Sequence, residues 1–169
     1  MKVPALASVL ALGLTISAAA QDRSNTLGNG VAPMATTDPQ IMIYRVAGVH
    51  NTYEPDNDGS STVFSCYNNS SVYETLRLRI IYRDGVLASD DSINMSPKRT
   101  LTLSTHNSAA FIEDLYLATG QLIMQGTAAI ISTSKEIFCS AMIVDAAASV
   151  PSGIALHMVR YNPAPGTVE

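Results

Sequence analysis

Residues 136–146 read EIFCSAMIVDA, a β-branched and apolar run whose only charges lie near its two ends. A short apolar run of this kind favours a buried β-strand. The run carries Cys139, and the only other cysteine, Cys66, lies in a second strand-like run, residues 61–68 (STVFSCYN). We therefore expect residues 136–146 to form a central strand of an all-β fold.

The clearest alternation of the chain lies in residues 74–83. A period of two places apolar side chains on one face of a strand and charged side chains on the other. The apolar row consists of Leu76, Leu78, Ile80 and Tyr82, and the cationic row of Arg77, Arg79 and Arg83, with Ile81 as the exception. Asp84-Gly85 follows, which predicts a hairpin turn into a return strand over residues 86–89.

Further strands are expected over residues 41–49, 99–105, 121–133 and 154–159, and residues 92–95 before Pro97 are expected at an edge or turn. Thr100, Thr102 and Ser104 should lie on the outer face of their strand. Ser108 as a cap and Gly120 as a stop predict one short helix between them. About eight short strands separated by turns indicate an antiparallel β-sandwich domain over residues 41–163.

The first 20 residues predict a secretory signal peptide, with Lys2 before an apolar core and Ala18 to Ala20 at the cleavage site. An uncleaved anchor is the alternative, but the apolar core is shorter than the roughly 20 residues that span a bilayer. We expect a flexible segment over residues 21–40 and a disordered tail over residues 164–169. The predicted location is secreted or periplasmic, by bacterial export, with no membrane span after cleavage.

Removing 20 of the 169 residues leaves 149, which suits one domain. The remaining chain has 9 Lys and Arg against 14 Asp and Glu, a net charge of −5. Binding to a nucleic-acid backbone needs clustered cationic residues. The charge therefore argues against a nucleic-acid partner.

In an exported chain, Cys66 and Cys139 predict a structural disulfide. The two residues are 73 positions apart, so closing this loop would stabilise the fold by about 4 kcal/mol in the chain-entropy model. Two free buried thiols are the alternative.

His50, His106 and His157 lack metal-binding spacing, and the chain has no nucleophile elbow. We therefore predict no catalytic residue, no enzyme activity and no cofactor. A hydrolase that uses His106 and a neighbouring hydroxyl is the weakest alternative. We expect His106 to lie in a solvated loop that enters the short helix.

Glu54 to Gly59 (EPDNDG) resembles the first half of a calcium loop, but the twelfth position from Glu54 is Ser65 instead of a bidentate Glu. A plain turn is favoured over a metal site. The adjacent carboxylates Glu113 and Asp114 should point in different directions, which argues against an acid/base pair. Asn68, Asn69 and Asn94 open N-x-S sequons, which matter only in a host that glycosylates.

Five stretches of the chain resemble a group of small exported bacterial β-sandwich proteins of unassigned function. They are TVFSCYNNS, TLRLRIIYRDG, SPKRTLTLSTH, GTAAIISTSKEIFCSAMIVDAA and GIALHMVRYNP. More distantly, the order of the strand-like motifs is similar to that in the sensory-rhodopsin-transducer family. In this chain the motifs cover residues 63–68, 76–84, 98–105, 128–132 and 137–145. That resemblance implies a β-sandwich that self-associates, and it assigns no functional residue. The export signal and the cysteine pair differ from that family.

The sequence therefore predicts a non-enzymatic exported module that binds an unknown protein partner or assembles with itself. The alternative is a small-ligand or calcium-dependent carbohydrate-binding module that uses residues 53–60 and nearby tyrosines.

Overall fold

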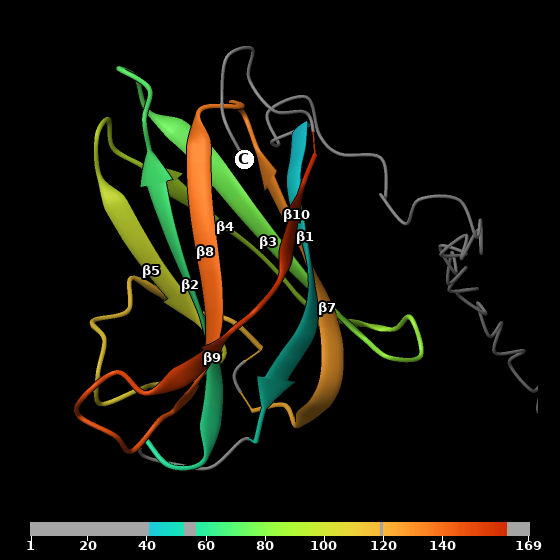
Figure 1. Ribbon diagram of the computed structural model, residues 1–169. Coiled ribbons are helices and arrows are strands. Elements are labelled where there is room, and N and C mark those ends of the chain that lie inside the picture. The colour runs from blue at the N-terminus through green and yellow to red at the C-terminus, as the bar shows by residue number, and fades with distance from the viewer. Residues whose placement is uncertain (1–40, 53–56, 119, 162–169) are drawn as a thin grey trace, which may run out of the picture. The chain divides into compact units, whose positions relative to one another are not determined.

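The computed structural model describes residues 41–52, 57–118 and 120–161, drawn in colour in Figure 1. These residues form ten strands, and none of them lies in a helix. The predicted all-β class is confirmed. The predicted signal peptide, the segment over residues 21–40 and the tail over residues 164–169 lie outside the described residues.

The strands differ widely in length. They are β1 (Ile41–Asn51), β2 (Ser60–Asn68), β3 (Glu74–Tyr82), β4 (Leu87–Met95), β5 (Thr100–Ser104), β6 (Leu115–Tyr116), β7 (Ile123–Ser132), β8 (Ile137–Asp145), β9 (Gly153–Ala155) and β10 (Met158–Arg160). The return strand and the short run expected after Asp84-Gly85 form a single strand, β4. Gly85 takes a φ of 88°, the left-handed conformation that the predicted hairpin turn requires.

All ten strands belong to one connected sheet. Antiparallel pairing builds two groups, β4-β3-β7-β1-β10 and β5-β2-β8-β9, and the pair Asn51 and Ser61 joins β1 to β2. β6 pairs with β5 in parallel, so the sheet is mixed and not purely antiparallel. The described sheet is nearly closed and barrel-like (Figure 1). The separate sheets of a sandwich are not confirmed.

The two groups of strands share one core. Phe64 from β2, Leu76, Leu78 and Ile80 from β3, and Ile130 from β7 are all 0% exposed. The alternation predicted for β3 is thus confirmed, because its Leu and Ile row faces this core. Burying such side chains contributes about 1.5–3 kcal/mol each.

β8 occupies a less central position than expected. It pairs with β2 along its whole length, from Ile137 to Asp145. On its other side it pairs with β9 only over Met142 to Val144. The predicted central position is therefore correct for the second half of β8 and wrong for the first half.

Residues 153–161, here called the C-terminal strap, close the sheet on this side. The strap pairs first with β8 as β9 and then with β1 as β10 (Figure 1). Leu156 N–H donates to Ala141 O at 2.9 Å, and Tyr161 N–H donates to Ile43 O at 2.7 Å. The single strand predicted over residues 154–159 is thus two short strands, because the chain changes neighbours at its middle.

Side-chain amides from segments other than β3 bond to the edge of β4, along what we call the β4 seam. At one end of the seam, Asn68 Nδ2 donates to the main-chain oxygens of Met95 at 3.3 Å and Ser96 at 3.2 Å. At the other end, Gln121 Nε2 donates to Ala88 O at 3.0 Å. The edge of β4 is therefore tied to the rest of the sheet without a continuous strand ladder.

The predicted short helix between Ser108 and Gly120 is wrong. Asp114 N–H donates to Thr102 O at 2.7 Å, and Leu117 N–H donates to Ser104 O at 2.6 Å. These backbone groups therefore bond to β5, not to the carbonyls one helical turn away. A helix of this length is only marginally stable alone, so pairing with β5 determines the local conformation.

Candidate functional site

Cys66 and Cys139 face each other in the β2-β8 register. Their Cα atoms are 4.1 Å apart and their sulfur atoms are at bonding distance, 2.11 Å. Cys66 is fully buried in the core. The predicted pair is thus brought together, and it joins two neighbouring strands that are far apart in sequence.

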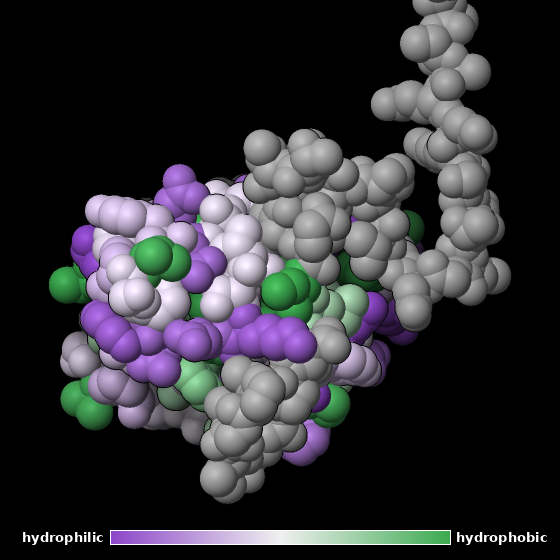
Figure 2. All heavy atoms as spheres, turned by 90° about the horizontal axis from the view of Figure 1, so that it is seen from above, coloured by the Kyte–Doolittle hydropathy of each residue, from purple (hydrophilic) through white to green (hydrophobic). Residues whose placement is uncertain are grey.

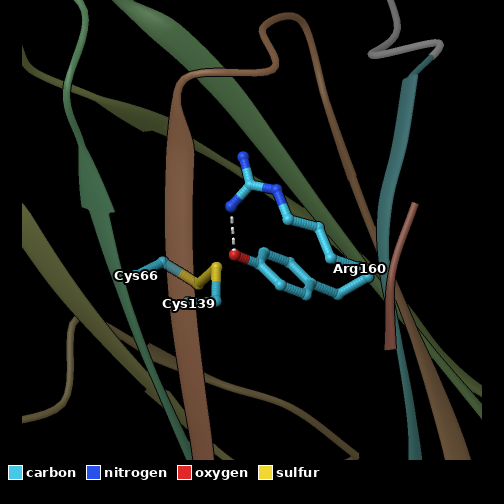
Figure 3. Close-up of a disulfide and its surroundings, with 4 residues drawn as sticks. Cys66, Cys139 and Arg160 are labelled. Carbon is cyan, nitrogen blue, oxygen red and sulfur yellow. Dashed lines mark hydrogen bonds between the residues drawn. A yellow bond between two sulfur atoms is a disulfide. The ribbon is translucent and has the colours of Figure 1, made fainter. Parts of the chain in front are cut away.

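Arg160 lies beside the disulfide and connects three strands (Figure 3). Its Nη1 donates to the Tyr44 hydroxyl on β1 at 2.5 Å, and its Nη2 donates to Lys135 O at 2.8 Å. Its guanidinium carbon lies 4.6 Å from the centre of the Phe138 ring on β8 and 5.2 Å from that of Tyr44. Cation–π contacts of this kind stabilise by about 0.5–2 kcal/mol. Arg160 therefore holds the C-terminal strap against both β1 and β8.

His106 is buried, at 9% exposure, and the solvated loop expected for it is wrong. Its Nδ1 lies 2.5 Å from Asn51 Oδ1, and its Nε2 lies 3.0 Å from the main-chain oxygen of Asp58. Asn51 Nδ2 in turn donates to Gln121 O at 2.6 Å. Both ring nitrogens of His106 therefore face carbonyl oxygens next to the bridge between β1 and β2.

The hydroxyls around His106 bond to main-chain groups. Ser61 Oγ and Ser104 Oγ both donate to the main-chain oxygen of His106, at 3.0 and 2.8 Å. Thr105 Oγ1 accepts the Thr62 N–H at 2.9 Å. Ser104, expected on the outer face, is 0% exposed because of this cluster. These contacts stabilise the junction of β1 and β2 and do not form the nucleophile–base pair that a hydrolase needs.

The other two predicted histidines lie apart from this cluster. His50 Nδ1 lies 2.7 Å from Ser60 Oγ. His157 is exposed between β9 and β10. Among the described residues, no group of three or more His, Cys, Asp or Glu side chains could hold a metal ion.

The calcium-like loop lies partly outside the described residues, which exclude positions 53–56. Its described end forms a turn, in which Asp58 Oδ1 accepts the Gly59 N–H at 2.8 Å. Glu113 and Asp114 have separate partners, as expected. Glu113 Oε1 accepts from Ser108 Oγ at 2.6 Å, and Asp114 Oδ2 accepts the Thr102 N–H at 2.8 Å.

Among the sequon residues, Asn68 is 0% exposed and its amide is used within the fold. Asn68 also donates to Val72 O at 2.9 Å and accepts the Ser70 N–H at 2.9 Å. A buried amide with these contacts has a structural role.

The clearest unused surface lies where β3 ends and β7 begins. A hollow of about 330 Å³ is lined there by what we call the hairpin-end surface: Tyr82, Arg83, Asp84, Leu122, Met124 and Gln125. Leu122 is 55% exposed and Met124 is 67% exposed. Val86 in the turn and Leu87 at the start of β4 are also exposed, at 57% and 46%.

A bulge in β7 explains why the side chains of Met124 and Gln125 reach solvent. Val49 pairs with Gly126 and Asn51 pairs with Ile123, so β7 has one more residue than β1 over this interval. The extra residue interrupts the regular alternation beside Met124 and Gln125. Ile123 returns to the core at 0% exposure, while Met124 and Gln125 are exposed.

Figure 2 views the end of the molecule at the top of Figure 1, and the described residues visible there range from hydrophilic to near-neutral, with scattered hydrophobic ones. Scattered apolar residues are normal on protein surfaces, whereas adjoining apolar residues with a polar rim are typical of interaction sites. The hairpin-end surface is therefore the candidate site.

The sequence did not identify this surface, because the bulge depends on how β7 pairs with β1. A weak signal is present, since Leu122, Ile123 and Met124 are consecutive apolar residues, which a strand cannot all place on one face. The described residues thus define an all-β domain with a cross-strand disulfide and an apolar surface at one hairpin end. No family model, curated protein or solved structure matches the chain.

Within the described residues, no helix is long and apolar enough to span a membrane.

Proposed function

We propose that the protein is an exported, non-enzymatic module that assembles with copies of itself through the hairpin-end surface. The observation that carries the proposal is the exposure of Leu122 and Met124 beside one hollow. Exposed apolar side chains with a charged rim match the composition of protein interfaces. Met adapts well to such surfaces because its side chain is flexible and polarisable.

The rim of this surface favours a second copy as the occupant. Arg83 and Asp84 are adjacent, exposed and of opposite charge. In a two-fold dimer the same patch meets itself, so Arg83 of each copy can pair with Asp84 of the other. The surface is thus complementary to itself in both apolar character and charge.

Two further observations support the exported and non-enzymatic parts of the proposal. The Cys66 and Cys139 pair suits an oxidising compartment, where disulfides persist. The ring nitrogens of His106 lie at hydrogen-bond distance from carbonyl oxygens inside the fold, which argues for a structural histidine. The proposed location is secreted or periplasmic.

Sedimentation velocity on the exported protein tests self-association. We expect the wild type to reach twice the monomer mass at high micromolar concentration. Met124→Glu should return it to monomer, because a carboxylate would be buried in the apolar contact. Ile112→Glu is the control, since Ile112 is 92% exposed and lies outside this surface.

Two results would count against the proposal. One is a wild type that stays monomeric over the whole concentration range. The other is dissociation by Ile112→Glu as complete as that by Met124→Glu, since the contact would then lie elsewhere.

The alternative is a small-ligand or calcium-dependent carbohydrate-binding module that uses residues 53–60. Four of these positions, 53–56, lie outside the described part of the chain. Melting temperatures with and without millimolar calcium distinguish the two proposals. An unchanged melting temperature favours the assembly module, and an increase of several degrees favours the calcium-dependent one.

A further inference from the structure

A second hollow lies on the outer face of the sheet, between β1, β7 and β10. It has a volume of about 230 Å³ and is lined by Arg45, Val46, Ala47, Thr127, His157 and Val159. The register places Val159 on one side of Arg45 and Ala129 on the other. Ala47 pairs with Thr127 in the next row. Small side chains around Arg45 thus leave room above the sheet.

The guanidinium of Arg45 has donors to spare. Within the described part of the chain, the hydrogen-bond acceptor found for it is Met42 Sδ, 3.2 Å from Nε. A thioether sulfur is a weak acceptor, and a guanidinium has five N–H donors. Arg45 is only half-buried, so its remaining donors can meet a ligand from solvent.

The surrounding face of the sheet is cationic. Arg79 lies one strand beyond Ala129 in the same row as Arg45, and Arg77 lies in the next row. Asp90 bonds to Arg77 at 2.6 Å and lies 3.1 Å from Arg79. Arg45, Arg77, Arg79 and Asp90 together carry a formal charge of +2 on this face. Such a local field attracts anions.

We propose that this hollow binds a small organic carboxylate. The planar fork of Arg45 matches the two oxygens of a carboxylate. His157 and Thr127 supply further hydrogen-bond donors at the rim, and Ala47 and Val159 supply apolar contact for a short aliphatic chain. The volume is below the roughly 300–1,000 Å³ of drug-sized sites, so the ligand has only a few carbon atoms. This inference does not depend on self-association.

NMR of the histidine rings tests this site with butyrate as the probe. The chain has three histidines, so the signals of His157 can be assigned by substituting His157→Gln. Butyrate at constant ionic strength should shift the His157 signals saturably, with a dissociation constant of about 1–10 mM. Arg45→Gln should weaken binding at least tenfold. The control Arg99→Gln, which replaces an exposed arginine outside the hollow, should bind as the wild type does.

A parallel titration with inorganic phosphate defines the ligand class. Phosphate binding as tight as butyrate binding, or tighter, would overturn the assignment to an organic carboxylate. The absence of a saturable His157 shift with butyrate, or a shift that Arg45→Gln leaves unchanged, would overturn the site itself. Both results are independent of the oligomeric state.

Discussion

At the scale of single residues, a few buried polar and sulfur groups secure strands that are distant in sequence. Cys66 and Cys139 join β2 to β8, and Asn68 joins the end of β2 to the end of β4. Each of these groups contributes more to the free energy of unfolding than an average side chain does, because its loss leaves either an unrestrained loop or an unsatisfied buried group.

Removing the disulfide should weaken the fold without changing it. We expect Cys66→Ala with Cys139→Ala to lower the free energy of unfolding by about 4 kcal/mol, since the bond closes a loop of 73 residues. Urea unfolding followed by circular dichroism measures the difference. The wild type under reducing conditions is the control and should lose a similar amount. A loss below about 0.5 kcal/mol in both would contradict a stabilising role.

Asn68 should be far more important for stability than another sequon asparagine. Asn68→Ala leaves the carbonyl groups of Val72, Met95 and Ser96 without this donor, so we expect a loss of about 2–4 kcal/mol. Asn94→Ala is the matched control: Asn94 is exposed and accepts one hydrogen bond from Thr75 Oγ1 at 3.0 Å. Its loss should stay within about 0.5 kcal/mol. Equal losses of stability in the two variants would contradict the role of Asn68 in holding the edge of β4.

At the scale of elements, the C-terminal strap closes one side of the sheet through very short strands. β9 and β10 have three residues each, so their position depends on side chains as well as on ladder hydrogen bonds. Gly153 is required at the start of the strap, because a Cβ there would lie 2.3 Å from Ile143 O.

Replacing Arg160 should loosen the strap selectively. Arg160→Met keeps much of the apolar side chain but removes the hydrogen bonds to Tyr44 and Lys135 and the charge over the Phe138 ring. We expect a loss of about 1–2 kcal/mol and faster amide hydrogen exchange in residues 153–161. Arg99→Met is the control, as Arg99 is exposed. Exchange that rises equally throughout the sheet, or not at all in the strap, would contradict this role.

The sequence predicted the strands whose pattern is local. β3 and its turn were predicted correctly, because Leu76, Leu78 and Ile80 alternate with charged residues and Asp84-Gly85 fits only a few turns. The segment before Gly120 was mispredicted as a helix, because its bonds to Thr102 and Ser104 arise from tertiary pairing. Local pattern also could not show that the strap changes neighbours between β9 and β10.

At the scale of the whole described sheet, the candidate surface and the His106 cluster come from pairings that no short motif contains. The cysteine pair was predictable because it needed only two residues and a compartment. The hollow at Tyr82 and Met124 was not, because it requires the β7 bulge and the β3 hairpin to lie side by side. What the sequence left open is therefore the surface on which the proposed function depends.

Exchanging the two rim charges tests the proposed two-fold contact most directly, with sedimentation equilibrium giving the dimer dissociation constant. Arg83→Asp alone should weaken the dimer at least tenfold, because it places like charges together across the contact. Adding Asp84→Arg should restore the wild-type constant to within about threefold, since opposite charges then meet again. Circular dichroism checks that both variants keep the fold. A dimer equally strong in all three proteins, or no dimer in the wild type, would contradict self-association through the hairpin-end surface.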